Sequence, residues 1–298
     1  MLRLLLLFCL INSFAFAQNK SRDAGHLIYL LGRDTTMAGS YSLHGSDFYI
    51  EVVARPNVSV TKISGSLNHK GELQTAQGYT YKPVPGKDSQ MIVQYNLYMR
   101  NDSTIIEQTR GKDVTTQRFA GQGMTANGIG VAFRYVLPFW PHYAPKKLGD
   151  SIVSAHLTLG TNKRLTITRT APDKLYAGST VMGMMTLQLD KKGKLASINA
   201  LGSSWNVTAL VTGPINLHQL AERYALEEQH GIGIKIINAA DSVFAKLNDA
   251  SVKIYYSRPQ VRGRTIFGSI VPWGKWWRTG ANAATRMVID RPVYFDGK

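Results

Sequence analysis

The residues best suited to binding a ligand gather near the C-terminus, between positions 251 and 298. This stretch carries nine Lys or Arg side chains against two acidic ones, Asp290 and Asp296. Three of the chain's five tryptophans, Trp273, Trp276 and Trp277, fall within five residues. Aromatic rings beside guanidinium groups can stack on sugars or clamp carboxylates and phosphates. The alternative is structural, because tryptophans fill cores and arginines stack on them to hold a loop.

Familiar catalytic patterns are missing from the sequence. It has no G-x-S-x-G elbow, no Walker-type phosphate loop and no H-E-x-x-H motif. The seven histidines form no close pair at ligand spacing, so we predict neither a metal site nor a cofactor. Any proton transfer would need acid and base residues from the N-terminal region, such as His142 or Asp150.

The first residues have the pattern of a secretory signal peptide. Arg3 supplies the positive charge, residues 4–11 form a short apolar core, and cleavage is expected between Ala17 and Gln18. The apolar core is too short to span a bilayer, and no later apolar run reaches the ~20 residues that a span needs. We therefore predict an exported protein, periplasmic or at the cell surface, without a transmembrane segment in its mature chain.

Cleavage would also remove the only cysteine, Cys9, so the mature chain can form no internal disulfide. It would keep 34 basic and 19 acidic side chains, a net charge of +15. Such a charge favours an anionic partner, namely an acidic glycan or the envelope surface, and export argues against nucleic acid. The alternative is a generally basic surface with no dedicated partner.

Most of the mature chain is predicted to be β-strand. Runs of β-branched and aromatic residues, separated by turn residues, occur at 47–54, 58–67, 79–84, 91–99, 131–137, 165–170 and 181–189. Strands at this spacing without intervening helices indicate an antiparallel sheet.

One amphipathic helix is predicted after Pro214. Asn216 is a good N-cap, Gln219 follows three residues later, and Gly231 suits the C-terminal end. We place a boundary near residue 235 and predict a hairpin of 241–247 and 250–256 across Asn248 and Asp249. The predicted organisation is a signal peptide (1–17), a β-rich domain (18–235) and a C-terminal domain (236–298).

Four ordered motifs in the C-terminal stretch resemble the opening of a bacterial family catalogued as domain of unknown function 2911. They are Tyr-Ser-Arg-Pro at 256–259, Gly-Arg-x-Ile-Phe-Gly at 263–268, Val-Pro-Trp-Gly at 271–274 and Trp-Arg-Thr-Gly-Ala-Asn-x-Ala-Thr at 277–285. The resemblance covers about residues 240–298. Residues 26–230 are loosely similar to the β-rich region that precedes this domain in some exported relatives, and the Leu-Gly-Arg-Asp-Thr run at 31–35 contributes to that similarity. It implies an exported, β-sandwich-like domain from a family without an established activity. Because the family continues with further strands, we expect this C-terminal domain to be incomplete.

Within the matching motifs we choose five candidate ligand contacts: Arg258, Arg264, Trp277, Arg278 and Asn282. We expect them to line a basic pocket of a non-catalytic binding module for an anionic or glycan ligand of the cell envelope. A second hypothesis is an envelope-associated hydrolase whose acid and base residues come from the N-terminal domain. A third is a purely structural domain, in which Arg264 and Arg278 are buried against carboxylates or carbonyl groups.

Overall fold

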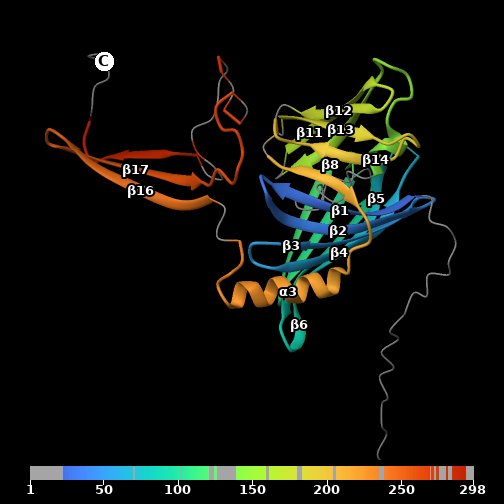
Figure 1. The fold of residues 1–298 in the computed structure, drawn as a ribbon, viewed down its shortest axis with the longest axis horizontal. Helices are drawn as coiled ribbons and strands as arrows, with labels where there is room; N and C mark the ends of the chain where they lie inside the picture. Colours follow the sequence, from blue (N-terminus) through green and yellow to red (C-terminus); the bar gives the residue numbers. More distant parts are fainter. Residues whose placement is uncertain are drawn as a thin grey trace, which may run out of the picture.

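The computed structural model describes residues 23–69, 71–101, 103–120, 124–125, 139–158, 161–179, 183–203, 206–234, 238–268, 270–271, 273–274, 280 and 284–292. It is mainly β, as predicted, with one large sheet and a small C-terminal one (Figure 1). The predicted cleavage site, Ala17 and Gln18, and the predicted strand at 131–137 lie outside the described residues.

The large sheet has 15 strands. Its first eight strands are β1 (Asp23–Leu31), β2 (Asp34–His44), β3 (Asp47–Ala54), β4 (Ser59–Leu67), β5 (Glu72–Val84), β6 (Lys87–Arg100), β7 (Ser103–Arg110) and β8 (Asp113–Ala120). The remaining ones are β9 (Met124–Thr125), β10 (Ser151–Thr158), β11 (Thr161–Ala171), β12 (Lys174–Ser179), β13 (Gly183–Leu189), β14 (Leu195–Asn199) and β15 (Thr208–Thr212). Neighbouring strands are antiparallel except for β9 and β10, which pair in parallel.

The pairings close most of this sheet into a ring that begins and ends at β5. One edge of β5 pairs with β4, and the other pairs with β9 at Glu72 and Leu73 and with β6 further along. From β4 the order runs through β3, β2, β1 and β15 back to β10 and β9. Strands β6, β7 and β8 therefore extend from the ring as a separate antiparallel layer.

Alternating side chains fill the inside of the ring. On β3, for example, Phe48, Ile50 and Val52 are buried in the main core, as the two-residue period of a strand requires. Phe139 and Trp140 also enter this core, and the ring of Phe139 lies 5.8 Å edge-on to that of Tyr41. Trp140 opens the short helix α2 (Trp140–Tyr143), which was not predicted. A packed core rather than an open channel thus occupies the ring.

Helix α3 (Leu217–Gln229) packs on the outside of β2, β3 and β5. The predicted N-cap is confirmed, since the Asn216 side chain accepts a hydrogen bond from the Gln219 amide at 3.0 Å. Its buried face lies against a second apolar cluster that includes Ala38, Val53 and Val58. Arg55 ties the helix further by an ion pair of 3.0 Å with Glu227.

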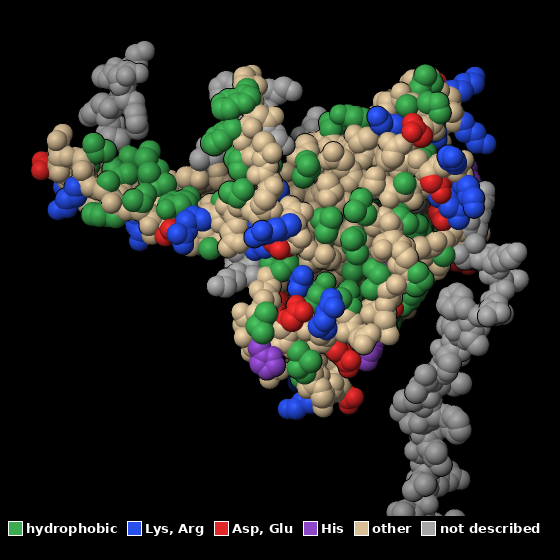
Figure 2. All heavy atoms as spheres, in the orientation of Figure 1, with side chains coloured by type: hydrophobic (Ala, Val, Ile, Leu, Met, Phe, Trp, Pro, Cys, Tyr) green, Lys and Arg blue, Asp and Glu red, His purple; other side chains and the backbone are tan. Residues whose placement is uncertain are grey.

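The small sheet consists of β16 (Asn238–Leu247), β17 (Ala250–Pro259) and β18 (Arg286–Ile289). The predicted hairpin is confirmed, with Asn248 at a positive φ of 52° in the two-residue turn. Figure 2 shows hydrophobic side chains gathered over this sheet, and Phe244, Leu247 and Met287 are at least half exposed. The described part of the polypeptide between β17 and β18 lies between this sheet and the ring in the view of Figure 1.

Candidate functional site

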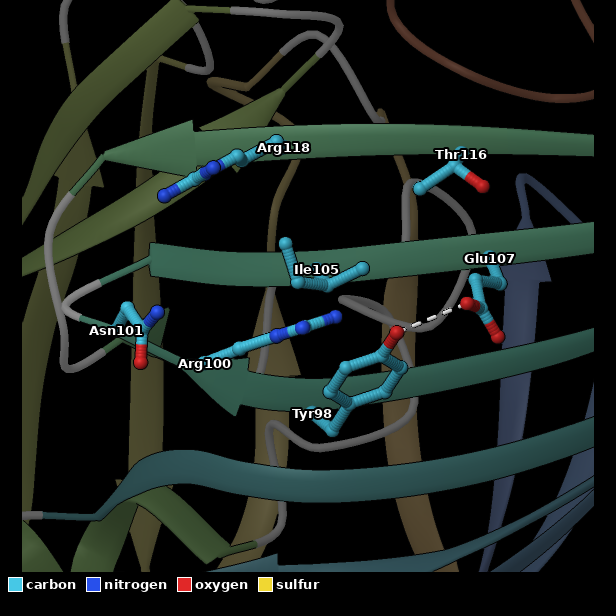
Figure 3. A pocket seen from close by; sticks show the side chains of 7 residues that line it. All are labelled: Tyr98, Arg100, Asn101, Ile105, Glu107, Thr116 and Arg118. Carbon is cyan, nitrogen blue, oxygen red and sulfur yellow. Dashed lines mark hydrogen bonds between the residues drawn. The ribbon is translucent and has the colours of Figure 1, made fainter.

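A hollow of about 430 Å³ lies on the outward face of β6, β7 and β8 (Figure 3). Seven residues line it: Tyr98, Arg100, Asn101, Ile105, Glu107, Thr116 and Arg118. The opposite face of the same strands carries Leu97 and Ile106, which belong to the main core. Because side chains alternate along a strand, burying those residues turns the lining residues outward.

The strand register places these side chains in neighbouring rows. Tyr98 is opposite Ile105, which is opposite Arg118, and Glu107 is opposite Thr116 in the next row. Tyr98 donates a hydrogen bond of 2.9 Å from its hydroxyl to Glu107 Oε1. This bond, together with partial burial and the negative charge of Glu107, raises the pKa of Tyr98. The phenol therefore stays protonated and keeps its hydrogen at neutral pH.

Two arginines supply the positive charge of the hollow. Arg118 donates from Nε to the Ser103 hydroxyl at 3.1 Å, which leaves its terminal nitrogens directed along the sheet. Figure 3 shows Arg118 extended toward Asn101 and Arg100 extended in the opposite sense toward Tyr98. Both arginines are exposed, and within the described part of the chain neither forms an ion pair. Their free N–H groups suit a planar anion such as a carboxylate.

Of the five C-terminal candidates, Arg258 lies on β17 and points to the neighbouring strand. Its Nε is 3.1 Å from Asp241 Oδ2, and the same oxygen accepts a hydrogen bond from Tyr256. The Arg258 side chain remains 65% exposed. A surface ion pair of this kind contributes little to stability.

Arg264 binds its own turn. Its Nε donates to the carbonyl of Val261 at 3.1 Å, and one terminal nitrogen donates to the carbonyl of Gln260 at 2.6 Å. Desolvation and the neighbouring charge of Arg262 lower the pKa of Arg264. The partners are carbonyl groups, as the structural hypothesis expects, but Arg264 is only partly buried, whereas that hypothesis expects it to be buried. Trp277, Arg278 and Asn282 lie outside the described residues, so convergence of the five remains a prediction.

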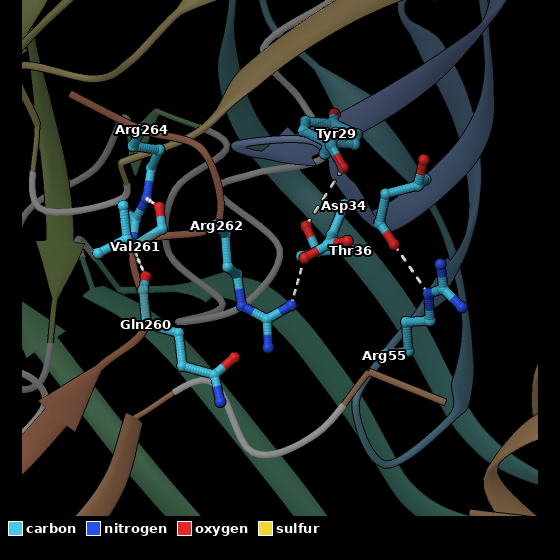
Figure 4. A network of polar contacts seen from close by, with 9 residues as sticks. Tyr29, Asp34, Thr36, Arg55, Gln260, Val261, Arg262 and Arg264 are labelled. Carbon is cyan, nitrogen blue, oxygen red and sulfur yellow. Dashed lines mark hydrogen bonds and ion pairs between the residues drawn. The ribbon is translucent and has the colours of Figure 1, made fainter. Parts of the chain in front are cut away.

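Arg262, which sequence reasoning did not single out, connects the C-terminal segment to the ring (Figure 4). Its side chain is only 8% exposed and forms an ion pair with Asp34 at the start of β2. Its backbone carbonyl accepts a hydrogen bond from the Arg33 amide at 3.2 Å. The only sequence signal was that the Gly-Arg-Asp turn at 32–34 and the 263–268 motif both belong to the family resemblance.

His142, named from the sequence as a candidate acid or base, has a buried carboxylate beside it. Its Nε2 lies 2.8 Å from Asp23 Oδ2, and Lys194 Nζ lies 3.0 Å from Asp23 Oδ1. Burial alone would raise the pKa of Asp23, but the interactions with His142 and Lys194 outweigh it and hold this pKa below its ordinary value. Burial and the charges of Asp23 and Asp190 raise the pKa of nearby Tyr41.

The other candidate acid, Asp150, stands in the turn before β10. It is exposed, and its backbone carbonyl accepts a hydrogen bond from the Arg169 amide at 3.1 Å. Among the residues that the structure describes, no group of three His, Cys, Asp or Glu side chains is placed to hold a metal ion. In the same residues, every helix is too short or too polar to cross a membrane.

The fold and the hollow define a predominantly antiparallel β protein with a basic, tyrosine-bearing surface on one layer. Residues 238–298 match a family model described as "Protein of unknown function (DUF2911)", in agreement with the resemblance found in the motifs. Comparison with curated proteins found no match. A similar solved structure is a DUF1089 family protein from Pseudomonas aeruginosa, with 10% identity over 56% of this chain and 90% of that one. Its TM-score is 0.35, which is too low to assign a shared fold.

Proposed function

We propose that this protein is an exported, non-catalytic binding module for an acidic saccharide of the cell envelope, and that β6, β7 and β8 hold the site. The observation that carries the proposal is the pair of exposed arginines, Arg100 and Arg118, which line the same hollow as Tyr98. A sugar ring can lie against the phenol while its carboxylate or sulfate binds a guanidinium group. The signal-peptide pattern and the formal net charge of +16 support an anionic ligand outside the cytoplasm.

Glu107 has a second part in this arrangement. By accepting the Tyr98 hydrogen bond it orients the phenol, and its free oxygen can accept a hydrogen bond from a sugar hydroxyl. Its negative charge also weakens the attraction for anions, which favours a saccharide with spaced charges over a compact polyanion.

The test is calorimetric titration of the mature protein with oligogalacturonate and with a neutral oligosaccharide of the same length. We expect heat only from the acidic ligand, and at least tenfold weaker binding by an R100A/R118A variant. The matched control is K87A/K112A, which removes the same charge from the start of β6 and from the turn between β7 and β8. If the two variants lost the same amount of affinity, the binding would depend only on the overall charge of the protein, and the proposed site would be contradicted.

A hydrolase is the second candidate, and the pairing of His142 with buried Asp23 is the observation that favours it. A carboxylate in this position orients an imidazole and stabilises its protonated form, so that the other ring nitrogen can accept a proton from water. The test is release of reducing ends from envelope polysaccharide by wild type and H142Q, with H218Q as the control because His218 is 85% exposed. Activity that survives in H142Q, or is absent from the wild type, would exclude this role.

A further inference from the structure

Two large aromatic side chains lie exposed on the turn between β17 and β18. Phe267 is 65% exposed and Trp273 is 74% exposed. Their rings stack at 5.7 Å between centroids and 21° between planes, so that each covers one face of the other. Val261, earlier in the same segment, is 53% exposed. Folding normally buries such side chains, so an exposed cluster of them indicates a surface that binds a partner.

Backbone hydrogen bonds hold the aromatic pair in place. The Gly268 amide donates to the Val271 carbonyl and the Val271 amide donates to the Ile266 carbonyl, both at 2.8 Å. Gly268 has a positive φ of 82°, and a Cβ there would lie 2.9 Å from the indole nitrogen of Trp273. Glycine is thus required for Trp273 to lie across the turn, and the pair is fixed before any partner binds.

The surroundings of the pair decide between a sugar and a lipid. Sugar recognition combines stacking with polar groups that bind the hydroxyls at the ring edge. In the described part of the turn, the Arg264 guanidinium donates to the carbonyls of Val261 and Gln260 instead. The exposed side chains in the described part of the turn are the aliphatic Val261, the phenyl ring and the indole, together with the polar Gln260 and Thr265. The aliphatic and aromatic side chains have the composition that enters the headgroup boundary of a bilayer.

Positive charge predominates in the part of the chain that carries this apolar tip. Between 238 and 292, the described residues include seven Lys or Arg, three Asp and no Glu. Arg258 and Arg291 are more than half exposed, and each also lies beside a carboxylate, Asp241 and Asp290 respectively. In Figure 2, basic side chains occur along the small sheet and at the base of the turn, with hydrophobic ones on the turn itself. Basic residues near an apolar anchor are attracted to anionic lipid headgroups.

We propose that the turn carrying Phe267 and Trp273 inserts into the surface of an anionic lipid membrane, and that the arginines around it bind the headgroups. The inference is independent of the proposed saccharide site, because it uses other residues in another sheet. It would hold the protein at a membrane surface while the β6–β8 layer stays free.

The experiment is co-sedimentation of the mature protein with vesicles of phosphatidylcholine alone and with one-third phosphatidylglycerol. We expect binding to the anionic vesicles that weakens as salt is added, since charge attraction is screened. F267S/W273S should bind at least tenfold more weakly, whereas F267L/W273F, which keeps the apolar surface, should bind within about threefold of wild type. The matched control is M91S/I92S, which removes two exposed apolar side chains from β6.

Three outcomes would overturn the proposal. Equal weakening by F267S/W273S and M91S/I92S would mean that the turn is not the anchor. Self-association in sedimentation velocity that F267S/W273S abolishes, without vesicle binding, would assign the turn to a second copy of the chain. Binding of soluble oligosaccharide that depends on Trp273, again without vesicle binding, would assign it to a glycan. We expect R100A/R118A to bind vesicles as wild type does. Membrane binding can therefore be judged even if the proposed saccharide site proves wrong.

Discussion

Arg262 and Asp34 form an ion pair across 228 positions of sequence, with the arginine side chain 92% buried and the aspartate at the first position of β2. The two residues join the segment after β17 to the turn between β1 and β2. The backbone bond from Arg33 to the Arg262 carbonyl reinforces the contact. This contact positions the segment that carries Phe267 and Trp273 relative to the ring.

A double-mutant cycle should measure the coupling of this pair. We expect D34N and R262M each to lower the free energy of unfolding in urea, with a coupling of about 1–3 kcal/mol because the arginine is buried. The corresponding cycle for Asp241 and Arg258, whose arginine is 65% exposed, should give below about 1 kcal/mol. Additive effects at Asp34 and Arg262 would show that the contact contributes no stability.

Gly32→Ala should disrupt the same contact from the backbone side. Gly32 has a φ of +64°, and a Cβ there would lie 1.8 Å from the Arg262 carbonyl oxygen. Gly45→Ala is the matched control, with a φ of +61° and nothing within 4 Å of the added atom. We expect G45A to lower the free energy of unfolding by about 1 kcal/mol through backbone strain alone, and G32A to lower it clearly more.

Limited proteolysis gives a second readout for these glycine variants. G32A should expose the segment after β17 to cleavage faster than G45A does, because only G32A displaces Arg262. Identical unfolding midpoints and cleavage rates for the two variants would argue against a close approach at this turn.

The stability contributed by Asp23 should depend on pH. Its pKa in the folded protein is lowered by His142 and Lys194, so its pairing stabilises the protein above the ordinary carboxyl pKa of about 3.9. That contribution is lost as the pH falls through the lowered pKa. We expect D23N to be less stable than wild type by about 1–3 kcal/mol at pH 7, and the difference to shrink below about pH 4.

Chemical denaturation at several pH values would measure this difference. D88N is the control, because Asp88 is an exposed residue of β6, and we expect an effect within about 0.5 kcal/mol at every pH. His142, Lys194, Tyr41 and Asp190 are the charged or titratable groups around Asp23, so H142Q should reduce the cost of D23N. If the difference in the free energy of unfolding between wild type and D23N grew as the pH fell, the lowered pKa of Asp23 would be contradicted.

Glu107→Gln should strengthen binding of the acidic saccharide. The amide oxygen can still accept the Tyr98 hydrogen bond, but the negative charge beside Arg100 and Arg118 is gone. We expect about two- to fivefold tighter binding by calorimetry, and a pKa of Tyr98 closer to its ordinary value by tyrosine titration. E51Q is the control, because Glu51 pairs with Lys62 on other strands. An unchanged affinity in E107Q would place the ligand elsewhere.

Local patterns determined much of the architecture. The β-branched runs identified strands now seen as β3, β4, β11 and β13, because alternation and turn residues act over a few positions. The helix after Pro214 was predictable for the same reason, since its cap is a contact between residues three apart. The two-residue turn likewise predicted the β16–β17 hairpin. The C-terminal motifs were sufficient to recognise the family resemblance over that segment.

Tertiary structure decided which distant residues meet. The hollow depends on the register of β6, β7 and β8, and no local pattern places Arg118 beside Ser103 or Tyr98 beside Glu107. His142 could be named from sequence but not Asp23, 119 positions away, which pairs with it only because the ring brings α2 to the start of β1. Residue types and short-range periodicity set the elements and the charge of this protein. Closure of the ring and the docking of Arg262 on Asp34 set its sites, because those contacts depend on packing between residues far apart in the chain.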